Sequence, residues 1–167
     1  MMWLKEADDQ APLSADDTEE AYTSLLAKAL KTRALPNTTG EINVEMKHLY
    51  DFWSHFLCRN FNPKMYADFR EYAYEDAAKS LFEGKESLIS YYEATLASKK
   101  KVIPDALAED YVQLVKDEQQ QLASLSSADR PAFKALRAQW RNGALDMKSR
   151  KKIGTLFDSE LTKELES

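Results

Sequence analysis

Hydrophobic residues recur at helical spacing along most of the chain, and nowhere do they alternate with polar ones as in a β-strand. One set occupies positions i, i+3, i+4 and i+8, which share one face of a helix: Leu49, Phe52, Trp53 and Leu57. The same pattern returns 39 positions later as Leu88, Tyr91, Tyr92 and Leu96. A repeated helix face is typical of stacked helix pairs, in which each pair buries its face against its neighbours.

The pattern predicts a leading helix, three helix pairs and a short terminal helix. The leading helix covers residues 16–32, the pairs cover about 43–83, 85–122 and 130–156, and the terminal helix covers 158–166. Asn62 followed by Pro63 is a helix-start signal, because an Asn side chain caps free amides and Pro is suited to the first helical position. We expect the helix that starts there to end near Gly84, and Gly143 to end the first helix of the third pair.

Residues 1–15 are acidic and show no periodicity, so they are predicted to form a flexible leader. The length of the remainder suits one compact domain, and we expect residues 16–167 to form a single helical-repeat domain. Glu75 and Asp76 lie in the later half of a predicted helix, where negative charge opposes the helix dipole. We therefore expect a hydrogen bond from another repeat to compensate them.

Few residues of this chain suit covalent, redox or metal chemistry. Cys58 is the only cysteine, so an intrachain disulfide and the CxxC schemes for metal or redox sites are excluded. His48 and His55 are seven residues apart without an HExxH motif, and the sequence has no P-loop, GxGxxG or GxSxG motif. No apolar run approaches the ~20 residues that span a bilayer. We therefore expect no metal, no cofactor, no membrane span and no enzyme activity.

Charge is segregated along the chain, although the net charge is only -5. Residues 1–20 carry seven acidic side chains against Lys5 alone. Residues 130–152 carry only one acidic residue, Asp146, against Arg130, Lys134, Arg137, Arg141, Lys148, Arg150, Lys151 and Lys152. Arg130, Lys134, Arg137 and Arg141 would line one continuous edge of a helix, which suits the phosphates of a single strand. The alternatives are an ordinary solvated face or a surface for an acidic protein. Lys99, Lys100 and Lys101 are interpreted as plain solvent-exposed charge in a turn.

Two long segments resemble a known family. EMKHLYDFWSHFLCRNFNPKMYADFREYAYEDA is similar to the first repeat of the C-terminal HEAT-like region of the La-related protein 1 family, and GKESLISYYEATLASKKKVIPDALAEDY resembles its second repeat. A third, weaker match surrounds Phe133, Leu145 and Asp146. The resemblance implies an all-α fold, a right-handed stack of HEAT-like helix-turn-helix repeats with three pairs plus the leading helix. It also implies a domain that binds the 7-methylguanosine cap and first nucleotides of messenger RNA and restrains translation of messages beginning with an oligopyrimidine tract.

The residues that match the family's cap pocket are replaced in this sequence. The resemblance puts Asp51 and Ser90 at arginine positions, His55 at an aromatic position and Ala97 at the position of the carboxylate that holds the base. The two sandwiching tyrosines correspond to Ala94 and Gln139. Asp51 would repel a phosphate, and a sandwich without its rings loses stacking worth ~1–3 kcal/mol per ring. We expect this chain to show no preference for capped RNA.

These patterns predict an RNA-associated binding module of a La-related, cytoplasmic translation regulator. RNA, expected to be single-stranded mRNA, would be contacted by the basic third repeat through Arg137, Arg141, Lys148, Arg150 and Lys151. Trp140 is a candidate stacking ring, although it also completes the apolar line of Phe133 and Leu136. The alternative is a protein-protein interaction module, a HEAT-like adaptor that has lost RNA binding. In either case we expect a monomeric domain within a longer chain.

Overall fold

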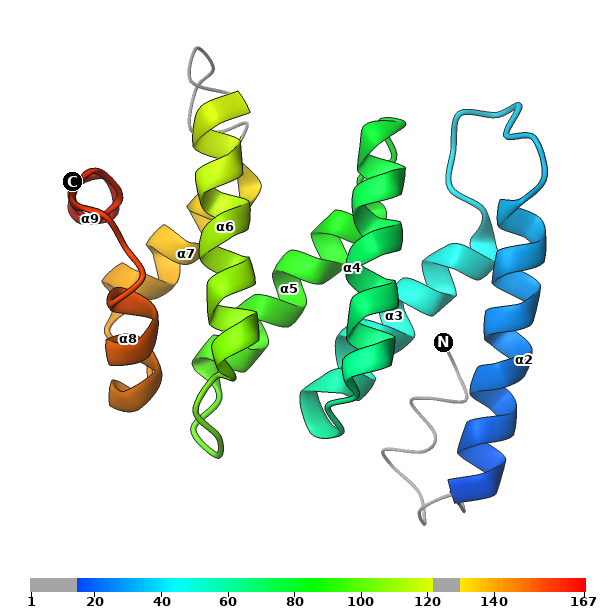
Figure 1. The fold of residues 1–167 in the computed structure, drawn as a ribbon, viewed down its shortest axis with the longest axis horizontal. Coiled ribbons are helices and arrows are strands. Elements are labelled where there is room, and N and C mark those ends of the chain that lie inside the picture. The colour runs from blue at the N-terminus through cyan, green and yellow to red at the C-terminus, as the bar shows by residue number, and fades with distance from the viewer. Residues whose placement is uncertain (1–14, 122–129) are drawn as a thin grey trace. The chain divides into compact units, whose positions relative to one another are not determined.

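The computed structural model describes residues 15–121 and 130–167. In this part of the chain, helices are joined by turns and loops, and none of the described residues forms a strand (Figure 1). Its eight helices are α2 (Ala15–Arg33), α3 (Val44–Arg59), α4 (Pro63–Ala78), α5 (Glu83–Ala97), α6 (Asp105–Gln121), α7 (Pro131–Asn142), α8 (Met147–Gly154) and α9 (Ser159–Glu166). The predicted all-α class is confirmed. The expected leader, apart from Ala15, lies outside the described residues, as does the loop expected before α7.

The chain divides into two compact units, residues 1–88 and 89–167, and the boundary falls within α5. The first unit contains α2, α3, α4 and the first residues of α5. The second contains the rest of α5 and all helices from α6 to α9. The expectation of a single domain over residues 16–167 stays a prediction.

The first copy of the repeated helix face forms the core of the first unit. α2 packs against α3, and α3 packs against α4. Trp53 is fully buried and stacks on Phe69 of α4 with 5.5 Å between ring centroids. Its indole N–H donates to the Tyr22 hydroxyl of α2 over 3.2 Å. The Trp53 side chain of α3 therefore contacts both α2 and α4.

The second copy of the face is buried in the same way. Tyr92 of α5 is fully buried and stacks on Tyr111 of α6, with centroids 5.3 Å apart. α7 packs against α6 and α9, and α8 packs against α6. Leu136 of α7 and Leu161 of α9 are fully buried between these helices. The repeated hydrophobic pattern in the sequence thus corresponds to two equivalent buried helix faces.

Local sequence signals correctly place most of the helix ends. Asn62 caps α4 by accepting from the Met65 amide at 3.0 Å, and Pro63 is the first helical residue. Asn43, Asp146 and Asp158 cap α3, α8 and α9 through their side-chain oxygens. Gly143 follows α7 with a left-handed φ of 74°. These starts and this stop are confirmed.

The predicted end of the helix at Gly84 is wrong, because α4 already stops at Ala78. Ser80 adopts a left-handed φ of 65°, and the amides of Ser80 and Leu81 donate to the carbonyls of Ala77 and Asp76. This is a Schellman ending without the usual glycine, so the sequence carries no clear stop signal.

Gly84 lies instead in the first turn of α5. A Cβ at this position would come within 2.5 Å of the Tyr50 ring of α3. The glycine is therefore required by the close approach of α5 to an aromatic side chain, and not by a helix end.

Candidate nucleic-acid interface

The third helix pair is fixed to the turn between α5 and α6. The Ser149 hydroxyl of α8 is buried and accepts from the Ile103 amide at 3.0 Å. Lys152 donates to the Ile103 carbonyl at 2.9 Å and pairs with Asp105 at 2.9 Å. Lys99 donates to the Ala144 carbonyl between α7 and α8. Lys99 and Ile103 of the turn and Asp105 at the start of α6 are thereby held beside the connection between α7 and α8.

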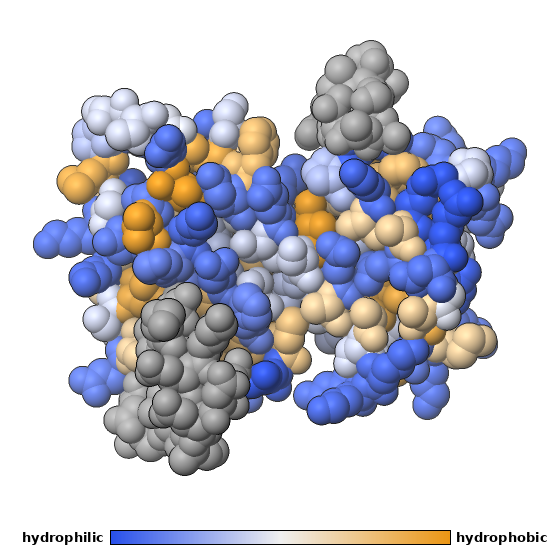
Figure 2. Space-filling model, turned by 180° about the vertical axis from the view of Figure 1, so that it is seen from behind, coloured by the Kyte–Doolittle hydropathy of each residue, from blue (hydrophilic) through white to orange (hydrophobic). Residues whose placement is uncertain are grey.

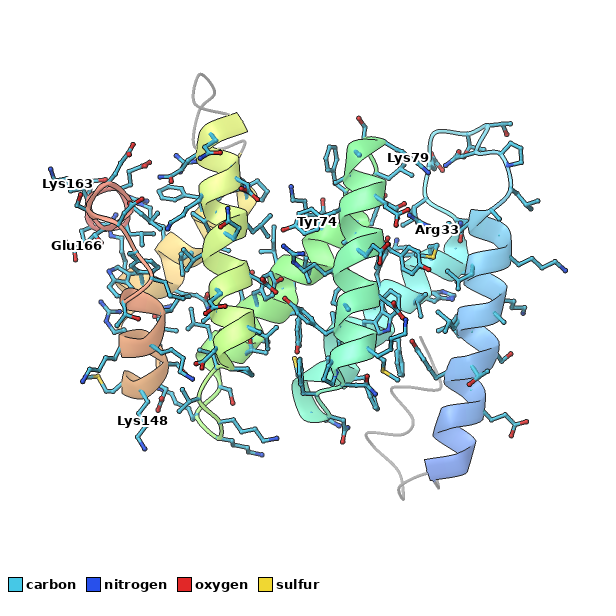
Figure 3. All side chains as sticks on the ribbon, viewed as in Figure 1. Arg33, Tyr74, Lys79, Lys148, Lys163 and Glu166 are labelled. Carbon is cyan, nitrogen blue, oxygen red and sulfur yellow. The ribbon has the colours of Figure 1, made fainter. Side chains whose placement is uncertain are left out.

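This arrangement gathers four exposed lysines at one end of the second unit: Lys100, Lys101, Lys148 and Lys151. We call them the lysine surface. Lys148 projects outward from the start of α8 (Figure 3). Within the described ranges none of the four forms an ion pair with a carboxylate. Lys100 and Lys101 are exposed in a turn, as expected, and only the tertiary contacts of Lys99 and Ile103 show that this turn lies beside α8.

Trp140 and Arg150 form a stacked pair next to the lysine surface. The Arg150 guanidinium lies 3.7 Å from the centroid of the indole, and it also donates to the Trp140 carbonyl at 2.8 Å. The Phe157 ring meets the indole edge-on, at 5.0 Å and 70°. Trp140 is thus partly exposed and partly packed. A hollow of about 430 Å³ lies here, lined by Trp140, Met147, Lys148, Arg150, Lys151 and Gly154.

Arg137 and Arg141 face the end of α9. Both donate to the main-chain oxygen of Ser167, at 2.5 Å and 2.9 Å. α9 also places Lys163 and Glu166 on the outside of this unit (Figure 3). The two arginines therefore already share one acceptor.

Arg130 does not belong to the predicted basic edge. It is buried, pairs with Glu164 of α9 at 3.0 Å and lies with its guanidinium 4.0 Å from the Phe133 ring centroid. Its position at the N-cap of α7 turns its side chain inward against α9. The expected continuous line from Arg130 to Arg141 is wrong at its first member, while Lys134 is exposed as expected.

At the positions matching the cap pocket, the second unit has no ring for a base. Gln139 is only 7% exposed; it accepts from the Tyr111 hydroxyl at 3.1 Å and donates to the Glu93 carbonyl at 2.8 Å. Burial, together with the charges of Glu93 and Glu118, raises the pKa of Tyr111 well above its ordinary value. Gln139 therefore links α5, α6 and α7 as part of the core. Ser90, Ala94 and Ala97 are exposed and carry no ring or cation.

The two matching positions of the first unit lie one turn apart on α3. His55 is exposed, and its Nδ1 atom is 2.7 Å from the main-chain oxygen of Asp51. The Asp51 side chain is half-buried. Neither position carries an arginine, which is already evident from the sequence.

A buried charge network occupies the first unit where α2, α3 and α4 meet. Asp76 is 2% exposed, accepts a hydrogen bond from the Tyr50 hydroxyl and pairs with Arg33 at 2.5 Å. Glu75 lies 3.6 Å from the same guanidinium. Asp76 therefore has compensating hydrogen bonds, but the expectation that they come from another repeat is wrong: they come from the leading helix α2 and from α3 of the same helix pair. Burial and the Asp76 carboxylate raise the pKa of Tyr50 far above its ordinary value.

A second hollow of about 560 Å³ adjoins this network, between the end of α2, the loop to α3 and the end of α4. Arg33, Asp76 and Lys79 contribute charged groups on one side, and the loop between Ala34 and Asn43, which includes the charged Glu41, forms its other side. Arg33 and Lys79 approach this region from α2 and from the end of α4 (Figure 3). No local pattern in the sequence indicates this hollow, because it depends on how the loop packs.

The surface of the molecule carries scattered apolar residues among polar ones. Seen from behind, hydrophilic residues cover most of the visible face, and the hydrophobic ones form separate patches (Figure 2). None of the described helices is both long and apolar enough to cross a membrane. The described residues also contain no group of three His, Cys, Asp or Glu side chains placed to hold a metal ion.

One comparison with known protein families bears on this chain. A family model described as the LARP1 HEAT repeat region matches residues 13–138, well over half of the chain. The match covers α2 to α6 and ends within α7, before Trp140 and the lysines of α8. The helical pairs, the duplicated buried face and this match agree, and the chain belongs to the LARP1 HEAT repeat family.

Proposed function

We propose that this chain is an RNA-binding module of a La-related, cytoplasmic translation regulator, and that it holds the backbone of single-stranded mRNA on its third repeat. The observation that carries this proposal is the lysine surface. Four exposed cations meet at one end of the second unit without a carboxylate partner among the described residues. Phosphates on a flexible strand suit such a surface, because each neutralised phosphate releases counterions.

Each basic residue has its own part in this proposal. Lys148 and Lys151 supply mobile point charges for phosphates. Arg137 and Arg141 each use one N–H on Ser167, and a guanidinium has further donors for a phosphate oxygen. Trp140 and Arg150 offer flat surfaces beside this path. The bound strand would therefore run over α8 toward the end of α7.

Salt dependence tests the proposal. We expect the affinity of the chain for a labelled oligouridylate to fall steeply with salt in a fluorescence anisotropy titration. The Lys148→Gln, Lys151→Gln double variant should bind more weakly, and its slope of log K against log salt should be shallower by about 0.7 per lost phosphate contact.

Lys28→Gln, Lys47→Gln is the matched control, since both lysines are exposed in the first unit. It should leave the slope unchanged. Absence of binding at low salt, or the same loss of slope in both double variants, would contradict the proposal.

A protein-protein interaction module is the second candidate. Leu35 and Val44 are 62% and 61% exposed, and both adjoin the loop that borders the 560 Å³ hollow of the first unit. Exposed apolar side chains at a hollow are typical of a protein contact. In a pull-down with the full chain as bait, a partner of this kind should survive Lys148→Gln, Lys151→Gln and be lost with Leu35→Asp, Val44→Asp. The reverse result favours RNA.

A further inference from the structure

We infer that the hollow beside Trp140 is a subsite for one unpaired nucleobase, which stacks on the Arg150 guanidinium while Lys148 and Lys151 hold the adjoining phosphates. This inference rests on the proposed function and adds to it a contact with a base, where the lysine surface alone would recognise only the backbone. It concerns residues of α8 and the end of α7, beyond the part matched by the family model.

The first argument is that Arg150 is held in place. Its guanidinium carbon lies 3.7 Å from the centroid of the Trp140 ring, and its Nη1 donates to the Trp140 carbonyl at 2.8 Å. Two contacts thus fix a flexible side chain in one orientation before any ligand binds. A guanidinium fixed in this way offers a planar surface on which a base can stack with little further loss of side-chain entropy.

The second argument is the size and chemistry of the hollow. Its volume of about 430 Å³ is in the range of small-ligand sites. Met147 is 78% exposed at this hollow, and its polarizable thioether can pack against an aromatic edge. Gly154 leaves the edge of the indole open, because a Cβ there would lie 3.3 Å from the ring. A flat aromatic ligand suits these walls.

The third argument is charge. Lys148 and Lys151 line the same hollow as the stacked pair, and none of the described acidic residues lines it. A base in the hollow would therefore have cations beside it, where the phosphates on either side of its sugar must lie. Stacking surfaces next to cations that follow the backbone are the usual arrangement for single-strand binding.

A comparison of two probes separates base recognition from backbone recognition. One is an oligouridylate, and the other is an abasic oligonucleotide with the same number of phosphates. We expect the full chain to prefer the oligouridylate roughly tenfold, as the loss of a stacked base implies. Arg150→Lys keeps the charge and removes the planar group, so it should abolish most of this preference and leave the salt slope unchanged.

Two further variants complete the experiment. Arg70→Lys is the matched control, because Arg70 also lies over an aromatic ring, that of Tyr74, in the first unit; it should keep the preference. Gly154→Ala, which narrows the hollow and favours helix, should reduce the preference, and it provides an independent test if Arg150→Lys fails to fold by circular dichroism.

The outcomes separate the inference from the proposed function. Equal affinity of the unaltered chain for both probes, or a preference that survives the folded Arg150→Lys and Gly154→Ala variants, overturns the base subsite while RNA binding stands. No binding of either probe at low salt overturns the proposed function itself.

Discussion

Asp76 shows how much a single residue can depend on tertiary structure. The sequence indicates that a carboxylate late in α4 needs a hydrogen bond, and the structure supplies two donors, the Tyr50 hydroxyl and the Arg33 guanidinium. Neither donor can be identified from spacing, because Arg33 is 43 residues away along the chain. Burial alone would lower the pKa of Arg33, but the Asp76 carboxylate raises it overall. Arg33 is therefore held in its charged form beside Asp76 within the first unit.

Removing one charge of this pair should be costly. Asp76→Asn keeps the shape of the side chain and removes the buried carboxylate that pairs with the half-buried Arg33, leaving it only the more distant Glu75, so we expect the free energy of unfolding to fall by about 3 kcal/mol. Urea denaturation followed by circular dichroism measures this change. Asp68→Asn is the control, since Asp68 pairs with the well-exposed Lys64 and should cost less than about 1 kcal/mol. Equal losses in the two variants would contradict this account.

The helix boundaries show which helix ends can be predicted from signals in the sequence. The starts of α3, α4, α8 and α9 follow from a polar side chain directly before each helix. The end of α4 at Ala78 does not, because the left-handed residue that follows it is Ser80, and a serine rarely adopts this conformation and carries no stop signal. Local chemistry therefore predicts a helix end only when the capping group is a neighbour in the sequence.

α7 depends on a capping group from another helix. Its N-cap residue, Arg130, makes no capping hydrogen bond with its side chain. The buried Glu118 carboxylate of α6 accepts instead from the amides of Ala132 and Phe133, each at 2.9 Å. The capping of α7 by Glu118 of α6 therefore cannot be predicted from the local sequence.

Glu118→Gln should weaken α7 specifically. The neutral amide cannot accept both hydrogen bonds as a carboxylate does, so we expect a loss of about 2 kcal/mol in the free energy of unfolding. Hydrogen exchange should show the first amides of α7 losing protection before those of α4. Glu109→Gln, an exposed carboxylate on the same helix α6, should have little effect. Unchanged protection at Ala132 and Phe133 would refute the capping role.

At the scale of the whole molecule, the chain retains the helical repeats of its family without the rings that the resemblance places around a cap. The fold could be predicted because it depends on a repeated apolar face, which hydrophobic spacing records directly. The candidate site could be predicted only in part. The sequence indicates Lys148, Lys151 and Trp140, but it cannot show that Arg130 is buried against Glu164 or that the α5–α6 turn joins the same surface.

The helical repeats are present but the rings of the cap pocket are replaced, so we predict equal binding of capped and uncapped RNA. Ala94 and Gln139 cannot sandwich a methylated base, and Gln139 is already hydrogen-bonded inside the second unit. Competition between a capped oligonucleotide and its uncapped counterpart for the same labelled RNA should give dissociation constants equal within about twofold, far below the factor that stacking on two rings would add. A clear preference for the capped oligonucleotide would show that other residues have replaced the missing rings.

The contact of Ser167 with Arg137 and Arg141 has a practical consequence for such measurements. Any polypeptide joined after Ser167, whether natural sequence or a purification tag, leaves the fold directly beside these two guanidinium groups. An acidic tag there would compete with an incoming nucleic acid, and a polyhistidine tag would add a basic segment of its own. Tags are therefore best attached at the other terminus or removed.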